Sequence, residues 1–171
     1  MMLHPATAHF AIVLPIVASI FGLIYLYTRS EGMSKISSRV LLFAALGVIA
    51  AWYTGSQAGP DAYPLLSDDG QHALLEHKAL GLYLAISFGV IALIKLVGCK
   101  MNKFVIEAVA IVLLLGATVT TLNQGKKGGE LTYTFGAGVE NHADGLDCLE
   151  NADDYIEEED EDEDDEDEEE E

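Results

Sequence analysis

Residues 9–28 read HFAIVLPIVASIFGLIYLYT, a run of 20 residues without a charged side chain. A helix rises about 1.5 Å per residue, so a run of this length crosses the hydrocarbon core of a bilayer, which is about 30 Å thick. Its apolar residues fall on every face instead of forming one stripe, which argues against a soluble amphipathic helix. The run therefore predicts a membrane-spanning helix.

Three further runs have the same character. Residues 40–58 carry no charge, residues 79–97 carry only Lys95, and residues 104–122 carry only Glu107. Both charged residues lie near an end of their run, from where we expect their side chains to reach the lipid headgroups. The chain is thus predicted to be all-α, a bundle of four transmembrane helices at about residues 5–28, 37–58, 72–98 and 103–123.

The charge of the chain is concentrated in a C-terminal tail. The formal net charge is −19, yet residues 140–171 hold 21 of the 28 acidic residues and no Lys or Arg. Residues 1–139 carry 7 acids against 9 bases, a formal net charge of +2. We expect the tail to be a disordered, solvated extension, with weak cation binding or binding of a basic periplasmic protein as the functional alternatives. The acidic tail and the lack of a basic soluble patch argue against nucleic-acid binding.

The basic residues predict the orientation of the bundle in the membrane. Six of the nine flank the connections between the first and second and between the third and fourth helices: Arg29, Lys35, Arg39, Lys95, Lys100 and Lys103. The positive-inside rule places these connections in the cytoplasm and both termini outside. A cleaved signal peptide is disfavoured for the first run, because a basic leader and a small-residue cleavage site are missing. We expect an integral protein of a bacterial or archaeal inner membrane.

This topology places all five histidines on the outer side: His4, His9, His72, His77 and His142. The first four form two pairs, each with a spacing of five residues, which separates the two members by about 140° around a helix. One histidine from each helix is therefore the simplest combination for a shared site. His9 and His77 lie deeper and are the first candidates, and His4 and His72 are the second. His142, at the root of the tail, is placed outside the site.

Three interpretations of these histidines stay open. His9 and His77 could be the two axial ligands of a b-type haem in membrane electron transfer, since the chain lacks the Cys-x-x-Cys-His motif of covalent attachment. A divalent or other d-block metal ion could instead use His4, His9, His72 and His77 together. In the third interpretation the histidines bind loop carbonyls and headgroups.

The third interpretation makes the chain a scaffold or assembly subunit without a cofactor, in a homo-oligomer or a larger membrane complex. Neither a nucleophile elbow nor a P-loop lies in a suitable setting, so an independent enzymatic activity is not expected.

A glycine-rich and aromatic segment, residues 128–139, follows the fourth run, and we expect it to fold back onto the outer mouth of the bundle. Together, His4-Pro5, His9-Phe10, the histidine pair before the third helix and this segment resemble the membrane family of domain of unknown function 2231, over residues 3–139. The resemblance implies a four-helix membrane bundle. Relatives joined to cytochrome c-like domains imply a link to haem or electron transfer. The positions carried over are His4, His9, His77 and residues 128–138. The chain departs from the family in Ala11, where many relatives have proline, and in its acidic tail.

Overall fold

A computed structural model of the protein describes residues 3–138. This part of the chain contains four long α-helices and one short 3-10 helix, η1. Their bounds are α1 Leu3–Thr28, α2 Glu31–Ala62, η1 Tyr63–Leu65, α3 Asp68–Met101 and α4 Phe104–Tyr133.

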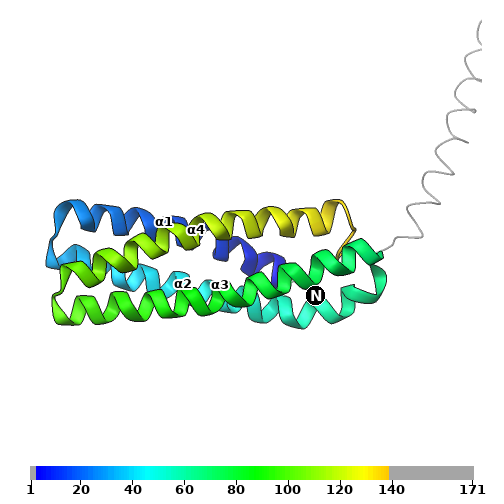
Figure 1. Cartoon of the computed structure of the whole chain (residues 1–171), viewed down its shortest axis with the longest axis horizontal. Helices are drawn as coiled ribbons and strands as arrows, with labels where there is room; N and C mark the ends of the chain where they lie inside the picture. Colours follow the sequence, from blue (N-terminus) through cyan, green and yellow to red (C-terminus); the bar gives the residue numbers. More distant parts are fainter. Residues whose placement is uncertain (1–2, 139–171) are drawn as a thin grey trace, which may run out of the picture. The chain divides into compact units, whose positions relative to one another are not determined.

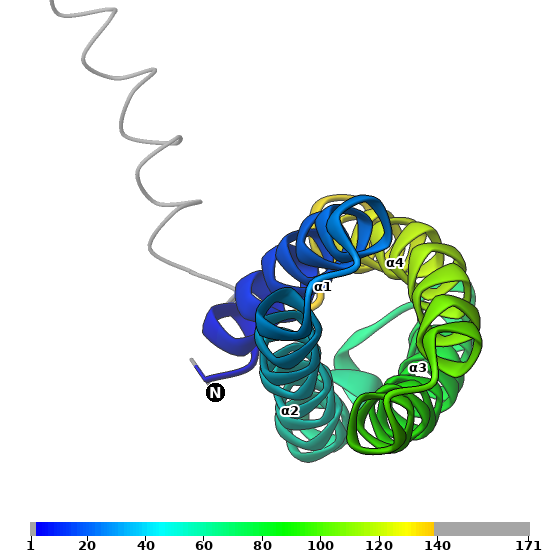
Figure 2. The same cartoon turned by 90° about the vertical axis from the view of Figure 1, so that its left-hand side faces the viewer.

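The four helices run alternately up and down and form a closed ring. Each packs on its neighbours in the chain, and α1 closes the ring against α4, as the view along the helices shows (Figure 2). Within the described residues, the backbones of helices on opposite corners of the ring do not come close to each other. The connections at residues 29–30 and 102–103 therefore lie at one end of the bundle, and residues 63–67 lie at the other (Figure 1). We call the first the lysine end, after Lys95, and the second the histidine end, after His4 and His77.

Local sequence signals explain where the helices start and stop. The side chain of Ser30 accepts a hydrogen bond from the backbone N–H of Met33 and caps α2, and Ser67 caps α3 through Gly70 N–H in the same way. Such caps satisfy N–H groups that have no partner within the helix. Asn102 ends α3 in the left-handed conformation, with φ at 51°. Short connections follow, and they hold consecutive helices antiparallel.

The interior is built mainly from small side chains. Ala18, Ala44 and Ala110 are fully or almost fully buried, and Phe88 is the largest side chain with no exposure. Lipid tails are as apolar as a protein core, so helices in a membrane associate through close packing more than through burial of apolar area. Small residues permit that packing. Large apolar side chains such as Phe43 instead lie on the outer surface of the bundle, where lipid would surround them.

All four helices are long and apolar enough to cross a membrane, as the sequence predicts. Their ends differ from the prediction: α2 starts at Glu31 rather than near residue 37, and α4 continues to Tyr133 rather than ending near residue 123. The start of the glycine-rich segment is therefore helical, because the glycines weaken α4 without ending it. Only after Tyr133 does the chain turn, and Phe135 then lies against Gly70 of α3.

Candidate functional site

His4 and His77 lie at the histidine end, one on α1 and one on α3. Both side chains are half-buried. Each ring rests against a glycine of a neighbouring helix. A Cβ atom at Gly55 of α2 would be 2.7 Å from His4 Cε1, and one at Gly128 of α4 would be 3.1 Å from His77 Cε1. The two imidazoles thus occupy space that two missing side chains leave free.

Hydroxyl groups hold His4 in place. Its Nδ1 atom lies 3.3 Å from the Oγ1 atom of Thr54 on α2, and Thr7 Oγ1 lies 2.7 Å from the same oxygen. Thr7 also donates to the backbone carbonyl of His4, at 2.9 Å. These contacts join the start of α1 to α2.

The surroundings of His77 are less complete. Gln124 of α4 donates from Nε2 to the His77 backbone carbonyl, at 2.6 Å. Within the described part of the chain, the buried atoms His77 Nδ1 and Gln124 Oε1 have no hydrogen-bond partner. A buried polar atom without a partner costs about 1–3 kcal/mol, so two such atoms on residues that a hydrogen bond joins suggest a site that something else completes.

The other histidines do not join this pair. The side chain of His9 is exposed, and its Nδ1 atom lies 2.6 Å from the carbonyl oxygen of Pro5 on the same helix. His72 is exposed near the start of α3, and His142 lies outside the described residues. Depth along the helix favoured His9 in the sequence, but rotation about the helix axis turns His4 toward α2 instead. Binding of a haem or metal by any of the four described histidines stays a prediction.

A single metal site shared by the four described histidines is a separate question. Among residues 3–138, no group of three or more His, Cys, Asp or Glu side chains is placed to hold a metal ion. Side chains five residues apart point in different directions on a helix, so His4 and His9 diverge, as do His72 and His77. The described residues therefore do not support one metal site made from all four histidines.

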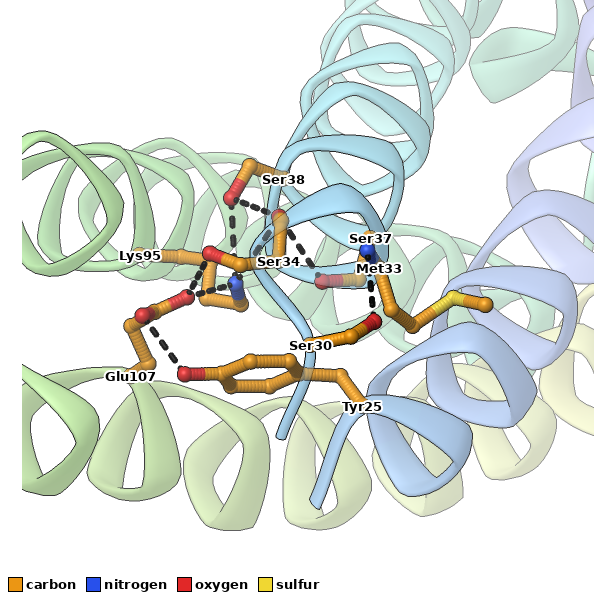
Figure 3. Close-up of polar contacts among 8 residues, drawn as sticks. All are labelled: Tyr25, Ser30, Met33, Ser34, Ser37, Ser38, Lys95 and Glu107. Carbon is orange, nitrogen blue, oxygen red and sulfur yellow. Dashed lines mark hydrogen bonds and ion pairs between the residues drawn. The ribbon is translucent and has the colours of Figure 1, made fainter. Parts of the chain in front are cut away.

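A second polar cluster lies at the lysine end, and the sequence interpretation missed it. Lys95 of α3 and Glu107 of α4 form an ion pair of 2.5 Å between Nζ and Oε2, with side-chain exposures of 1% and 3% (Figure 3). The expectation that both extend to the lipid headgroups is therefore wrong. Each lies about two turns or less from the short connection at residues 102–103, so the turn brings opposite charges face to face. The sequence did contain a signal for this ion pair, because two residues of opposite charge flank a short turn between two helices.

Three further residues complete this cluster. Tyr25 of α1 donates its hydroxyl to Glu107 Oε1 at 2.7 Å, and Ser34 of α2 donates to Oε2 at 2.5 Å. Lys95 also donates to Ser38 Oγ at 3.0 Å and to the Ser34 carbonyl at 3.3 Å. We call these five residues the lysine cluster: Tyr25, Ser34, Ser38, Lys95 and Glu107.

The arrangement of four apolar helices, with large apolar side chains on the outer surface, defines an integral membrane protein. No curated protein and no solved structure matched the chain. One family model did, over residues 1–141, and its description is "Predicted membrane protein (DUF2231)". The chain belongs to this family, in agreement with the resemblance of its histidine and glycine motifs.

Proposed function

We propose that the histidine end binds a b-type haem between His4 and His77, and that the protein takes part in membrane electron transfer. The observation that carries the proposal is that α1 and α3 each bring an imidazole to the same end of the bundle, with the buried His77 Nδ1 atom lacking a partner within the described residues. A haem iron between facing helices takes one axial imidazole from each.

The number of available ligands favours haem over a metal ion held by side chains alone. A tetrahedral zinc or a copper site needs three or four protein ligands, and residues 3–138 offer no such group. A haem iron needs two, since the porphyrin supplies the other four. Gly55 and Gly128 suit this role, because a side chain at either position would collide with the imidazole that rests on it. Bound haem would supply a one-electron couple, and the two histidines would hold its iron.

The proposed orientation places this site on the outer side of a bacterial or archaeal inner membrane. Arg29, Lys35, Arg39, Lys100 and Lys103 are all exposed at the lysine end, which the positive-inside rule assigns to the cytoplasm. The acidic tail, residues 140–171, lies outside the described residues. If it attracts a basic periplasmic electron carrier, its deletion should abolish an association that is strong at low salt and weak at high salt.

The test is the visible spectrum of the protein purified from membranes and reconstituted with haemin. We expect a Soret band at one haem per chain, lost or shifted in His4→Ala and in His77→Ala. The exposed histidines provide matched controls, so His9→Ala and His72→Ala should keep the band. Circular dichroism checks that each variant remains helical. The proposal fails if the wild-type protein takes up no haem in a stoichiometric amount, or if the four variants behave alike.

A groove between α3 and α4 favours a second candidate function, that of a scaffold or assembly subunit without a cofactor. The groove has a volume of about 400 Å³ and faces outward, and its lining includes Ser87, Gly116 and Thr120. Small residues of this kind let a second helix approach closely in a membrane. In this role, the protein in mild detergent should have a mass above that of one chain, and Gly116→Leu should reduce it to a single chain. An unchanged mass would argue against this role for the groove.

A further inference from the structure

The lysine cluster joins all four helices at one level of the bundle. Lys95 on α3 is bonded to α2 and α4, and the Glu107 carboxylate on α4 is bonded to α1, α2 and α3 (Figure 3). The ammonium group has three protons, and each has an acceptor: Glu107 Oε2, Ser38 Oγ and the Ser34 carbonyl. The carboxylate accepts three hydrogen bonds. Neither charge is left without partners.

Because both charged groups have all their partners, the helices that share the cluster are difficult to separate. A buried ion pair contributes little net stability compared with apolar residues of the same size, because both charges have lost their water. Once formed, however, it is costly to break, because moving one helix away leaves an unpaired charge in an apolar interior. The cluster therefore resists separation of the helices more than it adds to overall stability.

Aromatic rings cover the cluster on the side of the connections. The guanidinium of Arg29 lies 4.4 Å from the ring centre of Phe104, and that ring lies 6.1 Å from the ring of Tyr25. Lys95 Nζ lies 4.5 Å from the centre of the Tyr25 ring. The contacts thus run from the exposed Arg29, through the two rings, to the buried Lys95. Cation–π contacts of this kind strengthen when water is excluded.

In the part of the chain that the structure describes, the histidine end has no buried ion pair comparable to the lysine cluster. Its ion pair, Lys127 with Glu76, is exposed and has a separation of 3.2 Å. Exposed pairs contribute about 0–1 kcal/mol. The contacts between helices here are single hydrogen bonds of neutral groups, and His77 Nδ1 and Gln124 Oε1 lack partners. Separating the helices should therefore cost more free energy at the lysine end than at the histidine end.

We propose that the lysine cluster, covered by Arg29 and Phe104, is a latch that keeps the lysine end closed, so that opening of the bundle is confined to the histidine end. The four helices then behave as a bundle clamped at one end. Any group that enters the bundle, and any rearrangement that admits it, uses the opposite end. This inference stands whether or not a haem binds there, because it depends only on the contacts of the lysine cluster.

Hydrogen–deuterium exchange of the full chain in lipid nanodiscs, read by mass spectrometry, tests the latch. In the wild-type protein, we expect backbone amides near the histidine end, residues 6–10, 50–58, 72–80 and 124–131, to exchange at least tenfold faster than those near the lysine cluster. The compared lysine-end residues are 22–27, 34–41, 92–98 and 107–112. Equal rates at the two ends, or faster exchange at the lysine end, would overturn the proposal.

Variants show whether the ion pair is the cause. Glu107→Gln keeps the shape of the side chain but leaves Lys95 unpaired, so exchange at the lysine end should rise by about tenfold or more while the histidine end stays unchanged. His77→Ala, the control at the other end, should leave the lysine end unchanged. Because Glu107→Gln could fail to fold, the exchanged pair Lys95→Glu/Glu107→Lys is measured as well. Recovery of slow exchange in that variant supports the latch, and a lysine end that remains closed in Glu107→Gln contradicts it.

Discussion

Gly98 of α3 lies directly against Glu107 of α4. A Cβ atom at position 98 would be 2.7 Å from Glu107 Cγ and 3.0 Å from the Glu107 backbone nitrogen. Gly98 lies one turn beyond Lys95 on the same helix, so the backbones of α3 and α4 come together where the ion pair forms. The close approach brings the Glu107 carboxylate within 2.5 Å of Lys95 Nζ, and a larger residue at position 98 would prevent it.

Gly98→Ala should therefore destabilise the protein. Alanine is the better helix former by about 1 kcal/mol, but its methyl group would clash with the backbone of α4, and such overpacking costs about 1–3 kcal/mol. Because α4 would also move away from Lys95, we expect a net loss at the upper end of this range. Thermal unfolding in detergent, followed by circular dichroism, measures the change.

Gly89 is the matched control on the same helix. A Cβ atom there would have no atom within 4 Å, so Gly89→Ala should leave stability unchanged or raise it by up to about 1 kcal/mol. Equal stability of the two alanine variants would show that the contact between Gly98 and Glu107 does not limit the approach of α3 and α4.

Two ion pairs, one buried and one exposed, allow the effect of burial on stability to be distinguished from the effect of charge. Lys95→Met leaves the Glu107 carboxylate buried without its main partner, and the expected loss of stability is about 3–5 kcal/mol. Lys127→Met removes the exposed pair with Glu76 and should cost about 1 kcal/mol or less. Unfolding of both variants in the same detergent gives the comparison. A similar cost for the two substitutions would mean that Lys95 is not held in a closed interior.

A hydroxyl pair in the middle of the bundle provides a third prediction. Ser19 of α1 and Thr118 of α4 are buried and lie 3.0 Å apart through their hydroxyl oxygens. Thr118→Val removes one partner and should cost about 0.6 kcal/mol, the average for hydrogen bonds between membrane helices, and no more than about 1.7 kcal/mol. Thr120, whose hydroxyl within residues 3–138 bonds only to the Gly116 carbonyl of its own helix, is the control. Thr120→Val should be close to neutral, and a reversed order would contradict the assigned contact.

The length of the apolar runs was sufficient to predict the four helices, because bilayer thickness sets a minimum length that few other structures require. The partners of the charged residues could not be predicted in the same way. A lysine near the end of a run can keep its charge solvated by extending to the lipid headgroups, or it can form an ion pair inside the bundle. Which of the two occurs depends on the residue of another helix that faces it. For Lys95, that residue is Glu107, and the Gly98 contact makes the pairing possible.

The histidines show a related limit. Position along the chain gives the depth of a residue in a helix, and by depth His9 ranks above His4. The direction of a side chain depends on how the helix is rotated against its neighbours, and the rotation of α1 places His4 against Gly55 while His9 stays exposed. Small residues on α2 and α4 determine where an imidazole fits, and a single sequence does not indicate which glycine meets which histidine.

Gly128 and Gly129 are adjacent on α4, but only the first contacts a histidine. A Cβ atom at Gly128 would be 3.1 Å from His77 Cε1, whereas one at Gly129 would meet only Tyr133 Cδ2, at 4.0 Å. Gly128→Ala should therefore displace the His77 ring and change the nuclear magnetic resonance signal of its Cε1–H group in histidine-labelled protein. Gly129→Ala should leave that signal in place, with His77→Ala used to assign it. Because the readout needs no cofactor, it tests the position of the ring separately from haem binding. A His77 signal that moves equally in both glycine variants would show that the ring does not rest on Gly128, and the space assigned to it between α3 and α4 would then be wrong.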